Sequence, residues 1–192
     1  MGYITENEVI IRAAEKVSEI NKSARKILTE TTANDTDKFD VFLSHSSLEP
    51  ENFLLGIKLI LEDHELSVYV DRYNDPQLST TAVDQETAQI IKKRMRQSNT
   101  LLYVHSQYSK KSRWMPWELG FFDGLKGKVG VIPIVGENSS SFKNEEFLNL
   151  YPYIDTAKGN GGSKKLLWIN ASETNYANFG LWARGKDAIK MH

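Results

Sequence analysis

The sequence of 192 residues contains no cysteine. This absence excludes disulfide bonds and thiolate metal sites, and it fits a reducing compartment such as the cytosol. The sequence also lacks a basic excess, since its formal net charge is -1, whereas dedicated nucleic-acid binders usually carry one. One basic run, residues 92–94, lies on a predicted helix and is expected to form its solvated face. No apolar run approaches the length of a membrane span, and the N-terminus has no apolar signal core, so we expect no binding to nucleic acid or membrane.

Several familiar active-site motifs are missing as well. The polar loop at residues 44–50 contains no glycine, so it is not a phosphate-binding loop, and no serine lies in a Gly-x-Ser-x-Gly motif. The histidines lack the spacing of metal ligands, and we predict no metal site; they are His45, His64, His105 and His192. What remains is one carboxylate, Glu118, in polar and aromatic surroundings.

Strands and helices alternate along most of the chain. Helices are predicted from Pro50 onward, over residues 85–95 and from Ser112 onward. Strands are predicted between and after them; their residues are 39–43, 66–70, 101–104, 129–135, 153–154 and 166–169. This alternation is typical of a parallel sheet covered by helices on both faces. We therefore predict an α/β fold, a flavodoxin-like three-layer sandwich whose central parallel sheet has about five strands in the order 2-1-3-4-5.

An N-terminal extension precedes this domain. Apolar residues recur every three or four positions within residues 7–29 and predict one long amphipathic helix; they are Ile10, Ala13, Val17, Ile20, Ala24 and Ile27. This helix would either pack on its own domain or mediate self-association. A polar linker follows at residues 31–38. We therefore divide the chain into a helical extension with its linker, residues 1–37, and one globular domain, residues 38–192.

Residues 100–125 form the centre of the candidate site. An apolar strand is followed by a polar turn and a helix start, where Ser112 can act as the cap and Pro116 suits the first turn. Glu118 then lies early in the helix, just beyond the end of a buried strand. Trp114 precedes it by four residues, on the same helical face. An aromatic ring beside a carboxylate at a sheet edge is either a small-molecule site or a piece of core.

Other polar side chains are expected at the same edge of the sheet. In sheets of this order, ligands bind at the carboxyl ends of the strands, where the strand order reverses. The first strand ends in Ser44 and His45, the second in Asp71, and the third in His105. These side chains are therefore candidates to bind a ligand together with Glu118. Structural alternatives remain, because Ser44 can cap the following turn and Asp71 can tether its own loop.

These segments together resemble the Toll/interleukin-1 receptor (TIR) domain family. The similarity spans roughly residues 38–135, and we assign residues 38–192 to a TIR domain. The motifs follow the family's order; they are Phe39-Asp40-Val41-Phe42-Leu43-Ser44-His45 for the first box, Val70-Asp71 with the loop to Val83 for the BB loop, Ser112-x-Trp114-x-x-x-Glu118 for the motif of catalytic members, and Val131-Ile132-Pro133-Ile134 for the fourth strand. The BB loop departs from the pattern, because Gln77-Leu78-Ser79 stands near the place of its usual glycine.

The resemblance implies an enzyme, because catalytic TIR domains cleave NAD⁺ at the nicotinamide–ribose bond. Glu118 would be the catalytic carboxylate, and it would stabilise the charge of an oxocarbenium-like transition state. The implied substrate-binding residues surround it; they are Ser44, His45, Asp71, His105, Arg113 and Trp114. We expect Arg113 to offset the diphosphate charge, and one of Trp114 and Trp117 to be core, with Trp114 nearer the site. NAD⁺ is then the substrate, and no separate cofactor is expected.

Small TIR proteins of this kind resemble the signal-producing component of Thoeris antiphage systems. The resemblance implies that the product, ADP-ribose or a cyclic ADP-ribose isomer, diffuses to a separate effector in the cytoplasm. Self-association through TIR surfaces and the N-terminal helix is also expected. Two alternatives remain, a non-catalytic TIR scaffold that acts through TIR–TIR interaction and a sensor that binds a nucleotide without cleaving it.

Overall fold

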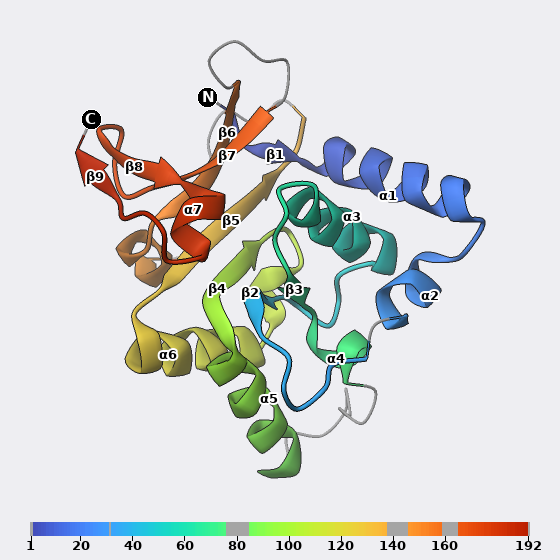
Figure 1. Cartoon of the computed structure of the whole chain (residues 1–192). Helices are drawn as coiled ribbons and strands as arrows, with labels where there is room; N and C mark the ends of the chain where they lie inside the picture. Colours follow the sequence, from blue (N-terminus) through green and yellow to red (C-terminus); the bar gives the residue numbers. More distant parts are fainter. Residues whose placement is uncertain (1, 31, 76–84, 138–145, 159–164, 192) are drawn as a thin grey trace.

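The structure is a computed structural model that describes residues 2–30, 32–75, 85–137, 146–158 and 165–191 (Figure 1). Within these ranges nine strands form one sheet. Helices α1 (Glu6–Ile20) and α3 (Glu51–Glu62) lie on one side of it, and α5 (Gln85–Gln97) and α6 (Trp114–Lys126) lie on the other. No helix in these ranges is long and apolar enough to cross a membrane. The segment Gln77-Leu78-Ser79 lies outside the described residues.

The parallel strands of the described sheet follow the predicted order. β3 (Val68–Tyr69), β2 (Phe39–Ser44), β4 (Ser98–His105), β5 (Val129–Val135) and β6 (Tyr153–Lys158) lie side by side, and each neighbouring pair is parallel. Numbered in chain order among themselves, these strands have the order 2-1-3-4-5. β5 is buried along its whole length and β4 along most of it, as expected of strands covered on both faces. The flavodoxin-like α/β fold is therefore confirmed.

The sheet extends beyond the predicted parallel strands. β7 (Lys165–Asn170), β8 (Asn175–Asn178) and β9 (Lys190–Met191) continue it in antiparallel pairing, and β1 (Ile4–Thr5) pairs with the end of β5. The sequence predicted β7 but not β8 or β9. Both are short and largely polar, and they lack the apolar alternation by which a strand is recognised in a sequence.

Helices α3, α5 and α6 were predicted, and so was a short helix over residues 142–150, where the structure has the 3-10 helix η2 (Glu146–Leu150). Three short helices were not predicted. α4 (Asp71–Asn74) is a single turn within the segment that resembles the BB loop. The others are the 3-10 helix η1 (Ser109–Lys111) and α7 (Phe179–Ala183) after β8. α6 begins slightly later than its predicted cap implies, but the hydroxyl of Ser112 still accepts the N–H of Met115 at 3.3 Å.

The prediction of one helix over residues 7–29 is wrong, because two helices occupy this stretch. Asn21, in the left-handed conformation with φ 50°, ends α1. Ser23 then caps α2 (Ala24–Thr29) by accepting the N–H of Lys26. Asparagine and serine are favoured at these two kinds of position, so the break is encoded locally.

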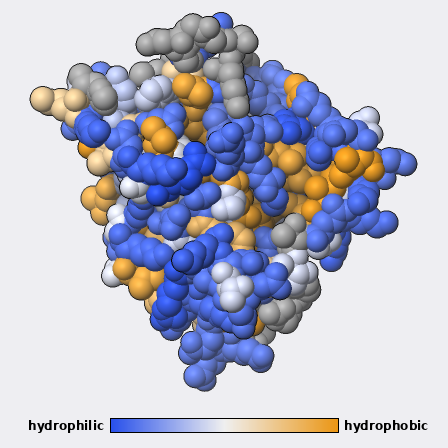
Figure 2. Space-filling view, in the orientation of Figure 1, coloured by the Kyte–Doolittle hydropathy of each residue, from blue (hydrophilic) through white to orange (hydrophobic). Residues whose placement is uncertain are grey.

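The buried face of α1 also differs from the predicted apolar seam. Val9 and Ala13 are 0% and 1% exposed, whereas Ile10 is 45% exposed. Gly56 of α3 permits the close approach of α1, because a Cβ there would lie 2.0 Å from the carbonyl oxygen of Val9. α1 therefore packs on its own domain, with Ile10 and Ile11 exposed. Figure 2 shows apolar side chains over α1 and α3 on a face that is otherwise mainly hydrophilic.

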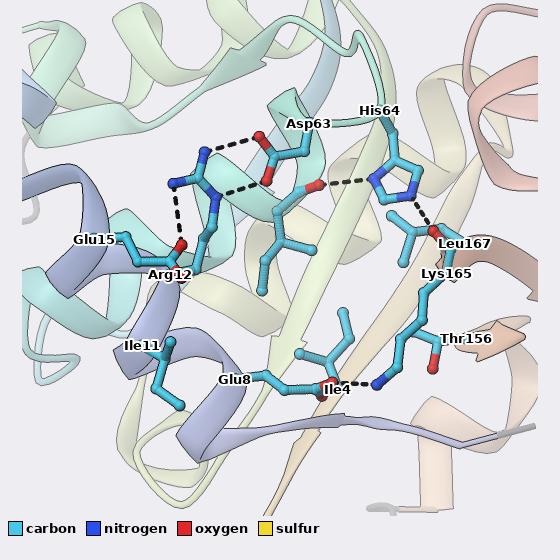
Figure 3. A pocket seen from close by; sticks show the side chains of 11 residues that line it. Ile4, Glu8, Ile11, Arg12, Glu15, Asp63, His64, Thr156, Lys165 and Leu167 are labelled. Atoms are coloured by element: carbon cyan, nitrogen blue, oxygen red, sulfur yellow. Dashed lines mark hydrogen bonds and ion pairs between the residues drawn. The ribbon is translucent and has the colours of Figure 1, made fainter. Parts of the chain in front are cut away.

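Ion pairs fasten α1 to the rest of the domain around a pocket of about 350 Å³ (Figure 3). Arg12 of α1 binds Asp63, just beyond the end of α3, with 2.7 Å between Nε and Oδ2. Glu8 of α1 binds Lys165 of β7. His64 lies nearby, with its Nε2 3.0 Å from the carbonyl oxygen of Lys165. These charged groups pair with one another across three elements, so they hold α1 in place over the sheet.

The prediction that residues 92–94 form a solvated basic face is wrong for one of the three. Successive side chains on a helix point about 100° apart, so three in a row cannot share one face. Lys93 is exposed and Lys92 partly buried, whereas Arg94 is only 3% exposed. Arg94 therefore faces the interior, where it meets Asp75 in a buried ion pair.

Candidate active site

The carboxyl end of β2 and the first turns of α6 meet at a buried point of the sheet edge. Ser44 is the last residue of β2, and its hydroxyl donates to Oε2 of Glu118 at 2.6 Å. Both residues are almost fully buried, with 1% and 2% of their surface exposed. The structure thus brings two predicted site residues from distant parts of the sequence into direct contact.

His45 and Asp71 form the second contact of the site. His45 Nε2 lies 3.0 Å from Oδ1 of Asp71, and Nδ1 lies 3.0 Å from the carbonyl oxygen of Ser46. Because both partners are acceptors, both bonds are made only when both ring nitrogens carry protons. Burial by itself would lower the pKa of His45, but the charge and hydrogen bond of Asp71, aided by Glu49, outweigh it and raise the pKa to about 9. His45 is therefore an imidazolium cation at neutral pH.

Glu118 titrates close to neutrality. Burial raises its pKa most, the charge of Asp71 raises it further, and the hydrogen bond from Ser44 and the charge of His45 lower it. The resulting pKa is about 7. Asp71 and His45 therefore act on Glu118 through their charges, and the predicted residues form one electrostatic unit.

A third carboxylate at this edge, besides Glu118 and Asp71, is Glu49, which was missed by the sequence analysis. It is 2% exposed, and its Oε1 accepts a hydrogen bond of 2.8 Å from the hydroxyl of Ser106. It thus joins the loop after β2 to the loop after β4 and adds negative charge near His45. An acidic residue in the polar loop before Pro50 was a signal that could have identified it. His105 ends β4 at the same edge and is 9% exposed; its role in the site stays a prediction.

Arg113 and Trp114 lie together in a neighbouring cleft of about 570 Å³ between α5 and α6. Ala88, Lys92 and Trp117 complete its lining. The rings of Trp114 and Trp117 meet edge to face, with centroids 5.1 Å apart, and the Lys92 ammonium lies 5.8 Å from the centroid of Trp117. Both tryptophans are only partly buried, so the expectation that one is a core residue does not fit this arrangement.

The group of this site best placed to act chemically is the Glu118 carboxylate, whose pKa is raised to about 7. Among the described residues, no group of three or more histidines and carboxylates is placed to hold a metal ion. Glu118 is buried and half ionised near pH 7, so a small electrostatic change decides its charge. A carboxylate in such a water-poor position stabilises a nearby positive charge far more strongly than one in water. The site is therefore suited to a reaction in which positive charge develops on the substrate.

Comparison with known proteins places the chain in a family. The TIR domain family matches residues 41–167, more than half of the chain, so the protein belongs to the TIR domain family. The resemblance inferred from the sequence motifs is therefore confirmed. The chain is also 37% identical, over 192 residues, to a protein of Bacillus cereus (strain MSX-D12) named "Probable 3' cyclic ADP-D-ribose synthase ThsB'". That similarity covers 95% of this chain and 98% of the relative.

Proposed function

We propose that this protein is a TIR-domain enzyme that cleaves the nicotinamide–ribose bond of NAD⁺ and releases a cyclic ADP-ribose isomer, or ADP-ribose, as an antiphage signal. The name of the Bacillus cereus relative supports this reaction, because it denotes synthesis of a cyclic ADP-ribose. The observation that carries the proposal for this chain is the buried Glu118 carboxylate, held by Ser44 and titrating near pH 7.

Glu118 would act on the charge that develops during bond cleavage. The C1′–N bond breaks, its electron pair leaves with nicotinamide, and the ribose becomes oxocarbenium-like. The leaving nicotinamide is neutral and needs no proton, so one carboxylate suffices. Ionised Glu118 stabilises the ribose cation, and the hydroxyl of Ser44 fixes the orientation of the carboxylate. The His45–Asp71 pair is neutral overall and fixes the wall of the site.

The fate of the ribose cation determines the product. Attack by water gives ADP-ribose, whereas attack by a hydroxyl or adenine nitrogen of the same molecule closes a ring. Water or a hydroxyl forms a new bond to C1′ and loses its proton, which Glu118 can accept, whereas an adenine ring nitrogen bonds C1′ through its lone pair and has no proton to lose. The near-complete burial of Glu118 and Ser44 limits water at this point and favours ring closure.

The cleft beside Trp114 would hold the ADP half of NAD⁺. Its two cations, Lys92 and Arg113, match the diphosphate charge, and its indole rings offer faces on which an adenine can stack. The sequence predicted that Arg113 offsets the diphosphate charge and that Trp114 binds substrate, and the lining of the cleft adds Lys92. Substitution of these cations should therefore weaken NAD⁺ binding more than the chemical step.

The cellular setting follows from the same proposal. The protein would act in the cytoplasm, where NAD⁺ is available and where a cysteine-free chain needs no oxidising environment. It would self-associate through TIR surfaces and the exposed side of α1, which carries Ile10 and Ile11, and its product would diffuse to a separate effector. The alternative is a TIR scaffold that self-associates but turns over no NAD⁺.

Product analysis with a matched pair of variants tests the proposal. The purified protein is incubated with NAD⁺ over a range of protein concentrations, and nicotinamide, ADP-ribose and cyclic products are separated by chromatography with mass detection. Glu118→Gln should abolish nicotinamide release, whereas Glu173→Gln, at an exposed position far along the chain, should leave it unchanged. Release that survives Glu118→Gln would remove Glu118 from the mechanism. No release by the unaltered protein, even with phage lysate added, would favour the scaffold.

A further inference from the structure

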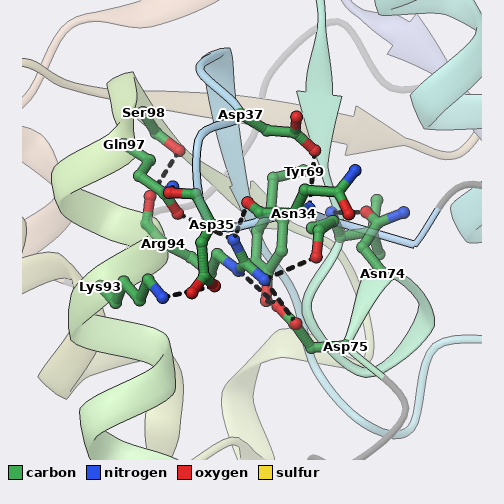
Figure 4. A network of polar contacts seen from close by, with 12 residues as sticks. Asn34, Asp35, Asp37, Tyr69, Asn74, Asp75, Lys93, Arg94, Gln97 and Ser98 are labelled. Atoms are coloured by element: carbon green, nitrogen blue, oxygen red, sulfur yellow. Dashed lines mark hydrogen bonds and ion pairs between the residues drawn. The ribbon is translucent and has the colours of Figure 1, made fainter.

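Arg94 is the centre of a buried polar network that includes Asp75, directly after α4 (Figure 4). It is 3% exposed, and its partner Asp75 is 1% exposed. Nε of Arg94 lies 2.6 Å from Oδ2 of Asp75, and Nη2 lies 2.7 Å from Oδ1, so the pair is bidentate. A buried ion pair adds little net stability compared with apolar packing, because both charges lose their hydration. Its benefit is therefore geometric.

The remaining donors of Arg94 bind the segment that leads into β2. Nη2 donates to the carbonyl oxygen of Ala33 at 2.8 Å, and Nη1 donates to the carbonyl oxygen of Asn34 at 2.6 Å and to the side chain of Gln97 at 2.9 Å. With the two bonds to Asp75, these contacts use all five N–H donors of the guanidinium. No other side chain can reproduce this set, so the position requires arginine.

Asp75 ends the single turn of α4, and Asp71 begins it. The N–H of Asp75 donates to the carbonyl oxygen of Asp71 at 2.9 Å. A helix of 4 residues has little stability of its own, so external contacts must hold it. The hydroxyl of Tyr69 also donates to Asp75, at 2.7 Å, which fixes the carboxylate from a second side. At the other end of the turn, Asp71 holds His45.

We propose that Arg94 is a positioning residue of the active site: by anchoring Asp75 it fixes α4, and α4 in turn holds Asp71 against His45 and beside Glu118. The same guanidinium ties the segment between α2 and β2 to α4, so the N-terminal extension and the site share one anchor. This inference rests on the proposed function for its kinetic consequence, but the displacement of Asp71 is a structural claim that can be measured separately.

The kinetic test compares Arg94→Met with Lys93→Met. Arg94→Met should lower kcat/KM by about tenfold to a hundredfold, because small misplacements of groups at a reacting centre cost that much. Lys93→Met removes only an ion pair with the largely exposed Asp35 and should leave kcat/KM unchanged. The decisive measurement is a double-mutant cycle with Asp71→Asn. Arg94→Met should cause no further loss of kcat/KM in the Asp71→Asn background, because the Asp71 carboxylate that Arg94 positions is already absent there.

Two further variants separate positioning from stability. Tyr69→Phe keeps the buried ring and removes one bond to Asp75, so it should cause a smaller loss that also vanishes with Asp71→Asn. It serves as the test if Arg94→Met does not fold. Phe179→Leu, in the buried core of α7 far from α4, should lower the melting temperature without changing kcat/KM.

A titration of the His45 ring by NMR tests the same inference without turnover. Displacement of Asp71 removes its charge from His45, so Arg94→Met should shift the His45 titration to lower pH, to the position found in Asp71→Asn. The inference is overturned if folded Arg94→Met keeps the unaltered titration of His45, or if its loss of kcat/KM is equally large in the Asp71→Asn background. If the unaltered protein releases no nicotinamide, the proposed function fails, while the NMR result still decides the role of Arg94.

Discussion

Nicotinamide release should rise steeply with pH between about pH 6 and pH 8, because the proposed mechanism needs Glu118 ionised. Burial and the charge of Asp71 raise the pKa of Glu118 from 4.5 to about 7. At about 1.36 kcal/mol per pKa unit, this difference corresponds to about 3 kcal/mol. About one tenth of the protein would then carry ionised Glu118 at pH 6, whereas a carboxyl with the ordinary pKa would be almost fully ionised there.

The assay is kcat/KM for nicotinamide release from pH 5 to pH 9, which reports groups of the free enzyme. We expect a rising limb near pH 7. Ser44→Ala should move this limb to higher pH, because the hydrogen bond from Ser44 lowers the pKa of Glu118. Ser18→Ala, at an exposed position on α1, is the matched control and should leave the limb in place. A flat profile between pH 5.5 and pH 8 would refute the assignment of a raised pKa to a catalytic Glu118.

Four other perturbations have definite expected outcomes. The folded state raises the pKa of Glu118, so ionisation of Glu118 destabilises the fold above about pH 5. Glu118→Gln should therefore raise the free energy of unfolding by about 3 kcal/mol at pH 8 and by much less at pH 4.5. The raised pKa of His45 stabilises the fold fully below pH 6.5, and urea denaturation should show this contribution disappearing as the pH rises through about 9. Gly56→Ala should lower the free energy of unfolding by more than about 2 kcal/mol, because the alanine Cβ would clash with the backbone of α1. A lower melting temperature would show this loss. The double substitution Lys92→Glu with Arg113→Glu should raise KM for NAD⁺ while changing kcat little, in steady-state assays.

The strand order and the edge that carries the site were predictable from the sequence. The strands that became β4 and β5 are continuous apolar runs, which is the pattern of strands buried on both faces. Once the order was fixed, the rule that ligands bind at the carboxyl ends of strands placed Ser44 and Asp71 at one edge. The helix start at Ser112 then placed Glu118 near them. These steps use only periodicity and topology, which a single sequence carries.

The polar contacts of the site were not predictable in the same way. Burial of Arg94 depends on which side of α5 faces Asp75, and a run of three basic residues does not reveal this. Glu49 was missed because its role depends on the loop after β4 approaching the loop after β2. The break at Asn21 was locally encoded, but a continuous apolar periodicity concealed it. Periodicity identifies elements, whereas the pairing of buried charges depends on their tertiary arrangement.

The charges of the site suggest how substrate binding and catalysis are linked. Asp71 binds the His45 cation directly, whereas the hydrogen-bond partner of Glu118 is the neutral hydroxyl of Ser44. With Glu49, the site thus holds three carboxylates and one cation, and the proton that relieves part of the excess negative charge resides on Glu118. The nicotinamide ring of NAD⁺ is positively charged and would supply the missing counter-charge.

NAD⁺ binding should therefore release a proton from Glu118 near neutral pH. At pH 6.5, where Glu118 is mostly protonated, calorimetric titration in buffers of different ionisation enthalpy should measure release of roughly half a proton or more per NAD⁺ bound. At pH 8, where Glu118 is mostly ionised and His45 still mostly protonated, the release should be much smaller. A slowly reacting NAD⁺ analogue that keeps the cationic ring avoids turnover during the titration. Glu118→Gln should abolish the proton release. Equal heats in all buffers at pH 6.5 would show that Glu118 does not face the nicotinamide, since a cation beside it must lower its pKa.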